Sequence, residues 1–364
     1  MSDDDVAQSL IASLAQQGQH VDDGGFTLDP SAAYRKLREH QLDDPHRYVL
    51  LLVEAAWLAA EDLDNAQLRI ELGAASLAGS ASVFDFQGLP LERGSLQHLF
   101  AAALGGTGKL QGEALRRARI LQLLGLAANA ALALQPKRLI LESSDAHGHR
   151  ERLRIEPDGQ LTLEPGKPSA PGWVRFMFCG PMLSRARSQR ERALLDRHCR
   201  YTRLAIHVDH HLISQRTDVD LDRGVDAHTG NPITAPVMLD GRAIGIIGPH
   251  RNPHASTNTW IVSRGVAIAD PSSATPGLQA VIELDLPLDL SRKRLQQGPK
   301  LDAVRAAIHD ARARVAEPAA PPPALPPQPS FTDDLLWKLL AFVILVVVFG
   351  IVFAIVEGIL ALLR

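Results

Sequence analysis

The chain has 364 residues, of which 46% are hydrophobic and 22% are charged, and its formal net charge is -3. This length suits two globular domains with additional segments, and the weak negative charge gives no electrostatic basis for a nucleic-acid partner. The two cysteines do not form a CxxC pair, so a structural zinc site is not expected and both thiols are expected to be free.

We expect residues 1–24 to be disordered, because they are polar and acidic and show no sustained hydrophobic period. They also lack a basic segment followed by an apolar core, which is the pattern of a secretory signal. On this basis the body of the protein is expected to stay in the cytoplasm.

Residues 25–165 alternate between helical and strand-like hydrophobic periods. Helices are predicted at 31–40, 45–63, 94–104 and 112–134, and strands at 66–72, 81–86, 138–143, 151–156 and 160–164. Asp44 followed by Pro45 is a typical helix start. This order predicts an α+β fold whose first domain is a two-layer α/β sandwich, with helices on one face of a mixed sheet.

Residues 166–316 are predicted to form a second α/β domain. A strand is predicted at 173–178, and two later strands flank Asp240-Gly241, a dipeptide typical of a tight hairpin turn. Helices are predicted at 184–201 and 300–315.

Two segments of unusual composition follow the second domain. Residues 317–332 are rich in proline and predict an extended linker. Within 333–364, the 18 residues from 339 to 356 carry no charge, and a helix needs about 20 apolar residues to cross a bilayer. We therefore expect a C-terminal transmembrane helix that contacts the membrane through 335–363, and a single-pass membrane protein with its body in the cytoplasm.

Three groups of residues are candidates for a binding site. Asp85 ends an apolar strand and is followed by Gly88 in a predicted turn, although an Asp before a turn is also ordinary loop chemistry. The second group is a run of small residues before a helix: Gly105, Gly106, Thr107 and Gly108. Backbone amides in such a run can hold phosphate, but a flexible turn is an equally good interpretation. The third is Gly125, within the helix that follows.

This order of elements and these motifs resemble the nucleotide-binding domain of the GHKL superfamily, which includes Hsp90, DNA gyrase B, histidine kinases and MutL. The resemblance covers roughly residues 26–145 and is closest to Hsp90-like bacterial proteins. Residues 166–316 resemble the transducer domain that follows in the same superfamily. The resemblance implies ATP as a ligand, with Asp85 accepting the adenine amino group and with Gly88, the run 105–108 and Gly125 in the nucleotide site.

The same resemblance implies that ATP hydrolysis is lost. Active members carry a Glu and, four residues later, an Asn in the second helix, and these side chains orient water and bind Mg²⁺. The corresponding positions here are Leu51 and Ala55, which leaves Mg²⁺ a doubtful cofactor. Glu54 is the one carboxylate near these positions and is therefore the only catalytic candidate, a weak one. The alternative interpretation is that Glu54 is an ordinary carboxylate at the edge of the helix.

Two functions follow from the resemblance. The first is a membrane-tethered Hsp90-like module that binds ATP or acts as a chaperone-like conformational protein, with little or no hydrolysis. The second is a catalytically dead pseudo-ATPase that serves as a scaffold for protein–protein interaction at the membrane. Both imply protein partners or clients, and a homodimer is one of the expected assemblies.

A third hypothesis, a metal-dependent hydrolase, comes from histidines and a carboxylate, which are zinc ligands. They cluster at His207, Asp209, His210 and His211, with His250 and His254 further on. The alternative for Asp209 and His210 is a turn between two strands. His198 followed by Cys199 suggests a thiol nucleophile, for which the end of an amphipathic helix is the alternative.

Overall fold

The computed structural model describes residues 43–315 with gaps, together with residues 19–21, 25–27 and 36. The gaps are residues 62, 64–65, 77–78, 105–109, 181–184, 216–220, 222–232, 251–258, 275 and 290–292. The predicted linker 317–332 and anchor 333–364 belong to a second unit and lie outside the described residues. Within the described part, no helix is both long enough and apolar enough to cross a membrane.

Near the N-terminus, β1 (Gln19–Val21) and β2 (Gly25–Thr27) form a two-stranded antiparallel pair. Strand β1 falls in the segment 1–24 that we expect to be disordered. The predicted helix 31–40 lies outside the described residues except for residue 36, which is helical.

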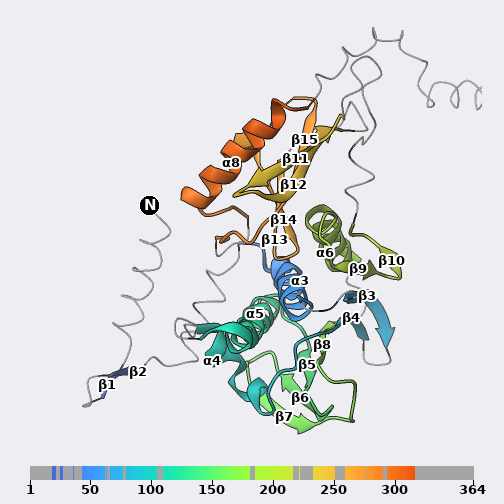
Figure 1. The fold of residues 1–364 in the computed structure, drawn as a ribbon. Helices are drawn as coiled ribbons and strands as arrows, with labels where there is room; N and C mark the ends of the chain where they lie inside the picture. The colour runs from blue at the N-terminus through green and yellow to red at the C-terminus, as the bar shows by residue number, and fades with distance from the viewer. Residues whose placement is uncertain are drawn as a thin grey trace, which may run out of the picture. The chain divides into compact units, whose positions relative to one another are not determined.

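The larger of the two main sheets has eight strands in the order β10-β9-β3-β4-β8-β5-β6-β7 (Figure 1). The strands are β3 (Gln67–Ser76), β4 (Gly79–Gln87), β5 (Arg138–Ser144), β6 (Arg150–Ile155), β7 (Leu161–Pro165), β8 (Trp173–Gly180), β9 (Ala205–Val208) and β10 (His211–Leu212). Neighbours are antiparallel except for β3 and β9, which are parallel. Buried and partly exposed residues alternate strictly along β8, as expected for a strand with one face in the core.

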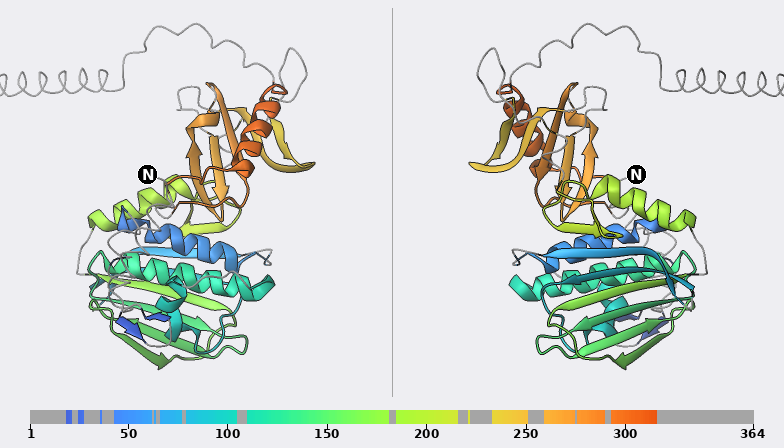
Figure 2. Two further views of the ribbon diagram at one scale, coloured as in Figure 1. Left: turned by 90° about the vertical axis from the view of Figure 1, so that its left-hand side faces the viewer. Right: turned by 90° about the vertical axis from the view of Figure 1, so that its right-hand side faces the viewer.

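One face of this sheet is covered by helices that include α3 (Tyr48–Ala59), α4 (Leu99–Leu104) and α5 (Gly112–Leu132). Helices α3 and α5 lie side by side (Figures 1 and 2). The predicted start at Asp44-Pro45 is confirmed. A short 3-10 turn, η1 (Pro45–Arg47), precedes α3, and the Asp44 carboxylate accepts a hydrogen bond of 3.1 Å from the backbone N–H of His46.

Aromatic side chains fill the space between α3 and the sheet. The ring of Tyr48 lies 5.9 Å, centroid to centroid, from the rings of Phe84, Phe176 and Phe178. All four side chains are buried, and burial of one such side chain stabilises a fold by about 1.5–3 kcal/mol. The alternating apolar residues of β4 and β8 thus direct one face of the sheet to the helices, and no helix of the described residues covers the other face (Figure 2).

The α+β class is confirmed, and the arrangement is consistent with the predicted two-layer sandwich. Its extent differs from the expectation, because β8 lies between β4 and β5 and because β9 and β10 extend the sheet at one edge. The boundary drawn between residues 165 and 166 therefore falls inside the sheet. The hydrophobic pattern at 173–178 predicts a strand, but it carries no information about the strands with which it pairs.

The second sheet has five strands in the order β11-β12-β15-β13-β14 and packs against α8 (Pro299–Arg312) (Figure 1). The strands are β11 (Ala235–Leu239), β12 (Arg242–Pro249), β13 (Thr259–Ser263), β14 (Val266–Asp270) and β15 (Leu278–Glu283). The predicted turn at Asp240-Gly241 joins β11 to β12, and both residues have positive φ, 49° and 76°, as a tight hairpin turn requires.

The hairpin β13–β14 and helix α6 (Arg185–His198) hold the two sheets together. The hairpin turn rests on α3: a Cβ added to Gly265 would lie 3.2 to 3.3 Å from atoms of Trp57, Val53 and Thr202. The φ of Gly265 is +83°, a conformation that favours glycine. Gly265 therefore meets both a steric and a conformational requirement at this junction.

Candidate functional site

The carboxylate of Asp85 lies on the helix-free face of the large sheet. Its neighbours in β4, Phe84 and Phe86, point into the core, so Asp85 points the other way. Arg175 in β8 binds both carboxylate oxygens: Nε donates to Oδ1 at 2.6 Å and Nη2 donates to Oδ2 at 2.7 Å. This hydrogen bond to Asp85 raises the pKa of Arg175. The acceptor predicted for an adenine amino group is therefore already engaged by a bidentate ion pair.

Asp85 and Arg175 belong to a row of charged residues that crosses six strands on the helix-free face. The row follows the register of the sheet and consists of Arg69, Asp85, Arg175, Glu142, Arg152 and Glu164. The sign of the charge alternates from each strand to the next, which is a stabilising cross-strand arrangement. The Glu142 side chain is only 2% exposed and pairs with Arg150 as well as with Arg152, the latter at 2.6 Å.

The indole ring of Trp173 lies between two arginines of this face. The guanidinium carbons of Arg150 and Arg175 are 4.2 Å and 4.9 Å from the centroid of the Trp173 ring. Such cation–π contacts restrain both guanidinium groups as well as stabilising them. The charges on this face are thus held in place by carboxylates and by an aromatic ring.

A cleft of about 350 Å³ opens beside the Asp85–Arg175 pair. Its lining includes Arg69, Trp173 and the apolar side chain of Leu63, which is 48% exposed. Arg69 donates only to the side chain of Gln67, at 3.4 Å, and forms no ion pair within the described part of the chain. The lining of the cleft holds two arginines and one carboxylate, and this excess of positive charge attracts a carboxylate.

Gly88 and Gly125, the two described glycines of the predicted nucleotide site, each lie in close contact with a neighbouring helix. Gly88 follows β4 and packs against α3, so that an added Cβ would overlap the carbonyl oxygen of Ala59. Gly125 lies within α5, where an added Cβ would overlap the carbonyl oxygen of Leu99 in α4. Both glycines therefore allow close packing of backbones. Gly105, Gly106, Thr107 and Gly108 lie outside the described residues.

The two positions that the GHKL resemblance would align with the catalytic Glu and Asn are buried in the core. Leu51 is 1% exposed and Ala55 is fully buried. Glu54 is 1% exposed, so it is not a carboxylate at the edge of a helix but part of the buried face of α3. Leu51 and Ala55 belong to the hydrophobic core and therefore pack against other core side chains instead of facing solvent.

The histidine cluster forms a turn, as its alternative interpretation predicts. Asp209 and His210 have φ values of 47° and 69° between β9 and β10. Both Asp209 oxygens are engaged, Oδ1 by the backbone N–H of Leu72 at 2.9 Å and Oδ2 by Arg192 at 2.8 Å. Among the described residues, no group of three His, Cys, Asp or Glu side chains could hold a metal ion. His254 lies outside them.

The candidate thiol is buried. Cys199 is fully buried, and this burial raises the pKa of its thiol far above the usual range, which opposes formation of a nucleophilic thiolate. Burial also lowers the pKa of the adjacent His198 to about 4. The Nδ1 of His198 donates to the carbonyl oxygen of Ala267 in β14 at 2.8 Å, so His198 links α6 to the second sheet.

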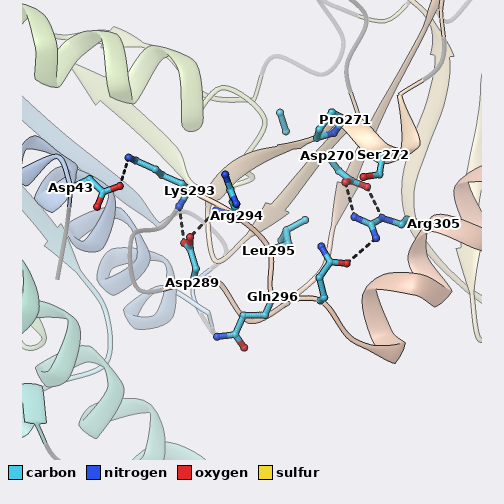
Figure 3. A pocket seen from close by; sticks show the side chains of 12 residues that line it. Asp43, Asp270, Pro271, Ser272, Asp289, Lys293, Arg294, Leu295, Gln296 and Arg305 are labelled. Atoms are coloured by element: carbon cyan, nitrogen blue, oxygen red, sulfur yellow. Dashed lines mark hydrogen bonds and ion pairs between the residues drawn. The ribbon is translucent and has the colours of Figure 1, made fainter. Parts of the chain in front are cut away.

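A second cleft, of about 780 Å³, lies between β14, α8, Asp289 and residues 293–297 (Figure 3). Two of its cationic side chains are paired with carboxylates of the same cleft. Arg305 donates to both oxygens of Asp270, at 2.9 Å and 3.0 Å, and Lys293 reaches Asp43 at 2.6 Å (Figure 3). This cleft was not expected from the sequence, because its residues come from segments that no local motif connects.

Sequence reasoning also missed the arginines of the helix-free face. The signal was present as a period of two, with charged residues at Arg69, Asp85, Glu142 and Arg175 on strands whose alternate residues are apolar. Such a pattern indicates that one face of the sheet is open. The sequence does not show which of these charged residues are neighbours, because that depends on the order of the strands. In comparisons with known proteins, no family model matches the chain and no curated protein is significantly similar to it.

Proposed function

We propose that the chain is a scaffold for protein–protein interaction at a membrane and that it does not turn over ATP. The observation that supports this most is the position of Asp85, whose carboxylate faces away from the helices and is bound on both oxygens by Arg175. An adenine amino group would have to displace an ion pair to use this acceptor. The proposal keeps the GHKL-like resemblance as a fold relationship and assigns it no catalytic role.

The packing of α3 favours the same function. A GHKL-type ATPase needs a general base and a Mg²⁺ ligand, and removal of a general base alone typically lowers a rate by 10²–10⁴. Leu51 and Ala55 stand at those positions, are buried, and cannot act on water. The alternative, in which ATP binds without being hydrolysed, would have to rely on residues 105–108.

The helix-free face of the sheet is the surface that we assign to a partner. Its cleft presents Arg69, which forms no ion pair among the described residues, beside the partly exposed Arg175, with Leu63 and Trp173 as apolar neighbours. Glu71 is also on this face, two residues further along β3, but it forms no ion pair with Arg69. We therefore expect the partner to contribute a carboxylate next to an apolar side chain, as an acidic segment of a protein does.

The membrane location in this proposal comes from the composition of 335–363. A helix in that segment would hold the described domains near a bilayer, with 317–332 as the spacer. Deletion of 333–364 should release the protein from membranes. If the truncated protein remained in the membrane fraction after a high-salt wash, the anchor would be elsewhere.

Nucleotide titration and turnover on the full chain in detergent test the proposed function. We expect no ATP hydrolysis above that of a Glu54→Ala variant, and no binding of ATP or ADP with or without Mg²⁺. Hydrolysis that is lost in Glu54→Ala would show a working ATPase and would refute the scaffold function. Binding without hydrolysis would favour the alternative ATP-binding module.

A further inference from the structure

Strand β7 is a free edge of the large sheet. It pairs with β6 on one side, and no other strand of the described chain pairs with its opposite side (Figure 1). An exposed strand edge presents unpaired backbone donors and acceptors to any strand that can approach it. The other edge of the same sheet, β10, is only two residues long.

The hydrogen bonds that flank β7 determine which of its backbone groups face outward. Glu156 donates to the carbonyl of Gln160 at one end of the hairpin, and Gly166 donates to the carbonyl of Arg150 at the other. Bonded pairs alternate in an antiparallel ladder, so the residues of β7 that bond to β6 are Thr162 and Glu164.

The backbone N–H and C=O groups of Leu161 and Leu163 therefore point outward in the plane of the sheet, away from β6. Their side chains lie on the helix side, in the same rows as Ile155 and Leu153 of β6. The two β6 side chains are buried, whereas Leu161 and Leu163 are 37% and 40% exposed. The apolar layer of the sheet thus continues to its edge and is partly exposed there.

We propose that β7 pairs with β7 of a second copy of this chain, antiparallel about a two-fold axis at Leu163. In this register Leu163 exchanges both backbone hydrogen bonds with Leu163 of the partner subunit. Each Leu161 N–H reaches the carbonyl of Pro165 of the partner subunit, and each Thr162 lies opposite Glu164 of the partner subunit. Proline has no N–H, but only the last outward position of the strand loses a donor.

Self-complementarity favours a second copy over an unrelated strand. The register sets leucine against leucine or proline on the helix side, and it places no like charges opposite each other on the other side. The contact is short compared with interfaces of 1,200–2,000 Å² that support stable complexes, so the dimer should be weak. Pairing would join the helix-free faces of two copies into one continuous surface. This inference does not depend on the proposed function.

Cysteine cross-linking of the full chain in detergent tests the register. The background is Cys179→Ser, which leaves only the buried Cys199. In the proposed dimer, the Cα atoms at position 163 are about 5.5 Å apart, within the range that a disulfide spans. The two copies of position 161 are about four strand positions apart, roughly 13 Å, which is too far.

We therefore expect Leu163→Cys to form a disulfide-linked dimer under mild oxidation and Leu161→Cys to form little. Leu212→Cys is the matched control, because Leu212 is 48% exposed at the opposite edge of the sheet. Cross-linking at 163 should exceed that of this control by about tenfold or more. Equal yields at 163, 161 and 212 would mean random collision and would overturn the proposal.

Leu163→Lys, made without added cysteines, should abolish self-association in sedimentation velocity while the thermal unfolding temperature stays unchanged. Undiminished self-association of Leu163→Lys would equally overturn it.

Discussion

The hydroxyl of Tyr48 donates a hydrogen bond of 2.9 Å to Oε1 of Glu191, which links the first residue of α3 to the middle of α6. Glu191 is fully buried, and it also accepts a hydrogen bond of 3.0 Å from Ser82 and pairs with Arg187 at 3.3 Å. Burial raises the pKa of Glu191. The guanidinium of Arg187 lies 4.1 Å from the ring centroid of Phe178. This network ties α6 to the helix side of the sheet, because a buried polar group without partners is costly.

Loss of the Glu191 carboxylate should be strongly destabilising. Glu191→Leu leaves Arg187, whose side chain is 6% exposed, without its counter-charge, and such a change typically costs about 3–5 kcal/mol. Tyr48→Phe removes one hydrogen bond and should cost about 1–3 kcal/mol. The control is Arg190→Ala, which breaks an exposed pair with Asp44 and should cost no more than about 1 kcal/mol. Urea unfolding measures all three, and equal losses for Glu191→Leu and Arg190→Ala would contradict the structural role of the network.

Gly125 should tolerate no side chain, although alanine is the better helix former. In Gly125→Ala the new methyl group would overlap the carbonyl oxygen of Leu99, so α4 and α5 would have to separate. Overpacking of this kind typically costs 1–3 kcal/mol. Gly298→Ala is the matched control, because an added Cβ there meets no atom within 4 Å. A stabilised Gly125→Ala protein in thermal unfolding would show that α4 and α5 are packed less closely than described.

The sequence predicted those parts of the fold that depend on residues adjacent in the chain. Asp44-Pro45 predicts the start of a helix and Asp240-Gly241 a hairpin turn, and both interpretations are confirmed. Asp85 could not be placed in the same way. Its role depends on Arg175, 90 residues later, and on the insertion of β8 between β4 and β5. Sequence periodicity shows which residues share a face but not which strands are adjacent.

The α3 positions illustrate the same limit. The sequence predicts that Leu51 and Ala55 replace two functional side chains, and the structure adds that both are buried. Glu54, interpreted as a helix-edge carboxylate, is buried because α3 is packed on almost every side, which leaves no polar face by which to recognise an edge. The roles of residues 105–108 and of the anchor 335–363 stay predictions.

Asp85→Asn should leave nucleotide binding unchanged and alter stability only slightly. The substitution removes the charge that holds Arg175, but the two side chains are 24% and 35% exposed, so the pair is worth at most about 1 kcal/mol. Titration of wild type and variant with ATP, and urea unfolding of both, check the two expectations. A clear loss of ATP affinity in the variant would restore Asp85 as an adenine-binding residue.

Release of Arg175 should have a second consequence, at the cleft. In Asp85→Asn the guanidinium is no longer neutralised, so the cleft gains positive charge beside Arg69. An acidic peptide with leucines between its aspartates should then bind more tightly than to wild type, and Arg69→Glu should weaken its binding by about tenfold, equivalent to about 1.4 kcal/mol. A peptide with asparagine at the acidic positions is the control. Equal binding of the acidic and control peptides would argue against a carboxylate-binding cleft.

Stability should fall as the pH drops below 6.5 because of His198. Burial lowers the pKa of this side chain from 6.5 to about 4 in the folded protein. Between these values the unfolded chain binds a proton that the folded chain excludes, so acid favours unfolding. The contribution is fully present above pH 6.5 and is lost as the pH falls toward 4. A difference of about 2.5 pKa units corresponds to about 3 kcal/mol in total.

The variant His198→Gln isolates this effect because it keeps a donor for the Ala267 carbonyl but cannot titrate. Urea unfolding of wild type and variant at pH 8, 7, 6 and 5 should give free energies of unfolding that depend on pH in the same way for both proteins above pH 7. Below that, wild type should lose up to about 1.4 kcal/mol more per pH unit than the variant. The loss would open the contact between α6 and β14, since His198 joins the two elements there. Equal slopes for both proteins at pH 5–6 would mean that His198 is accessible to protons in the folded state, and that the junction of the two sheets is less tightly packed than the burial of this residue indicates.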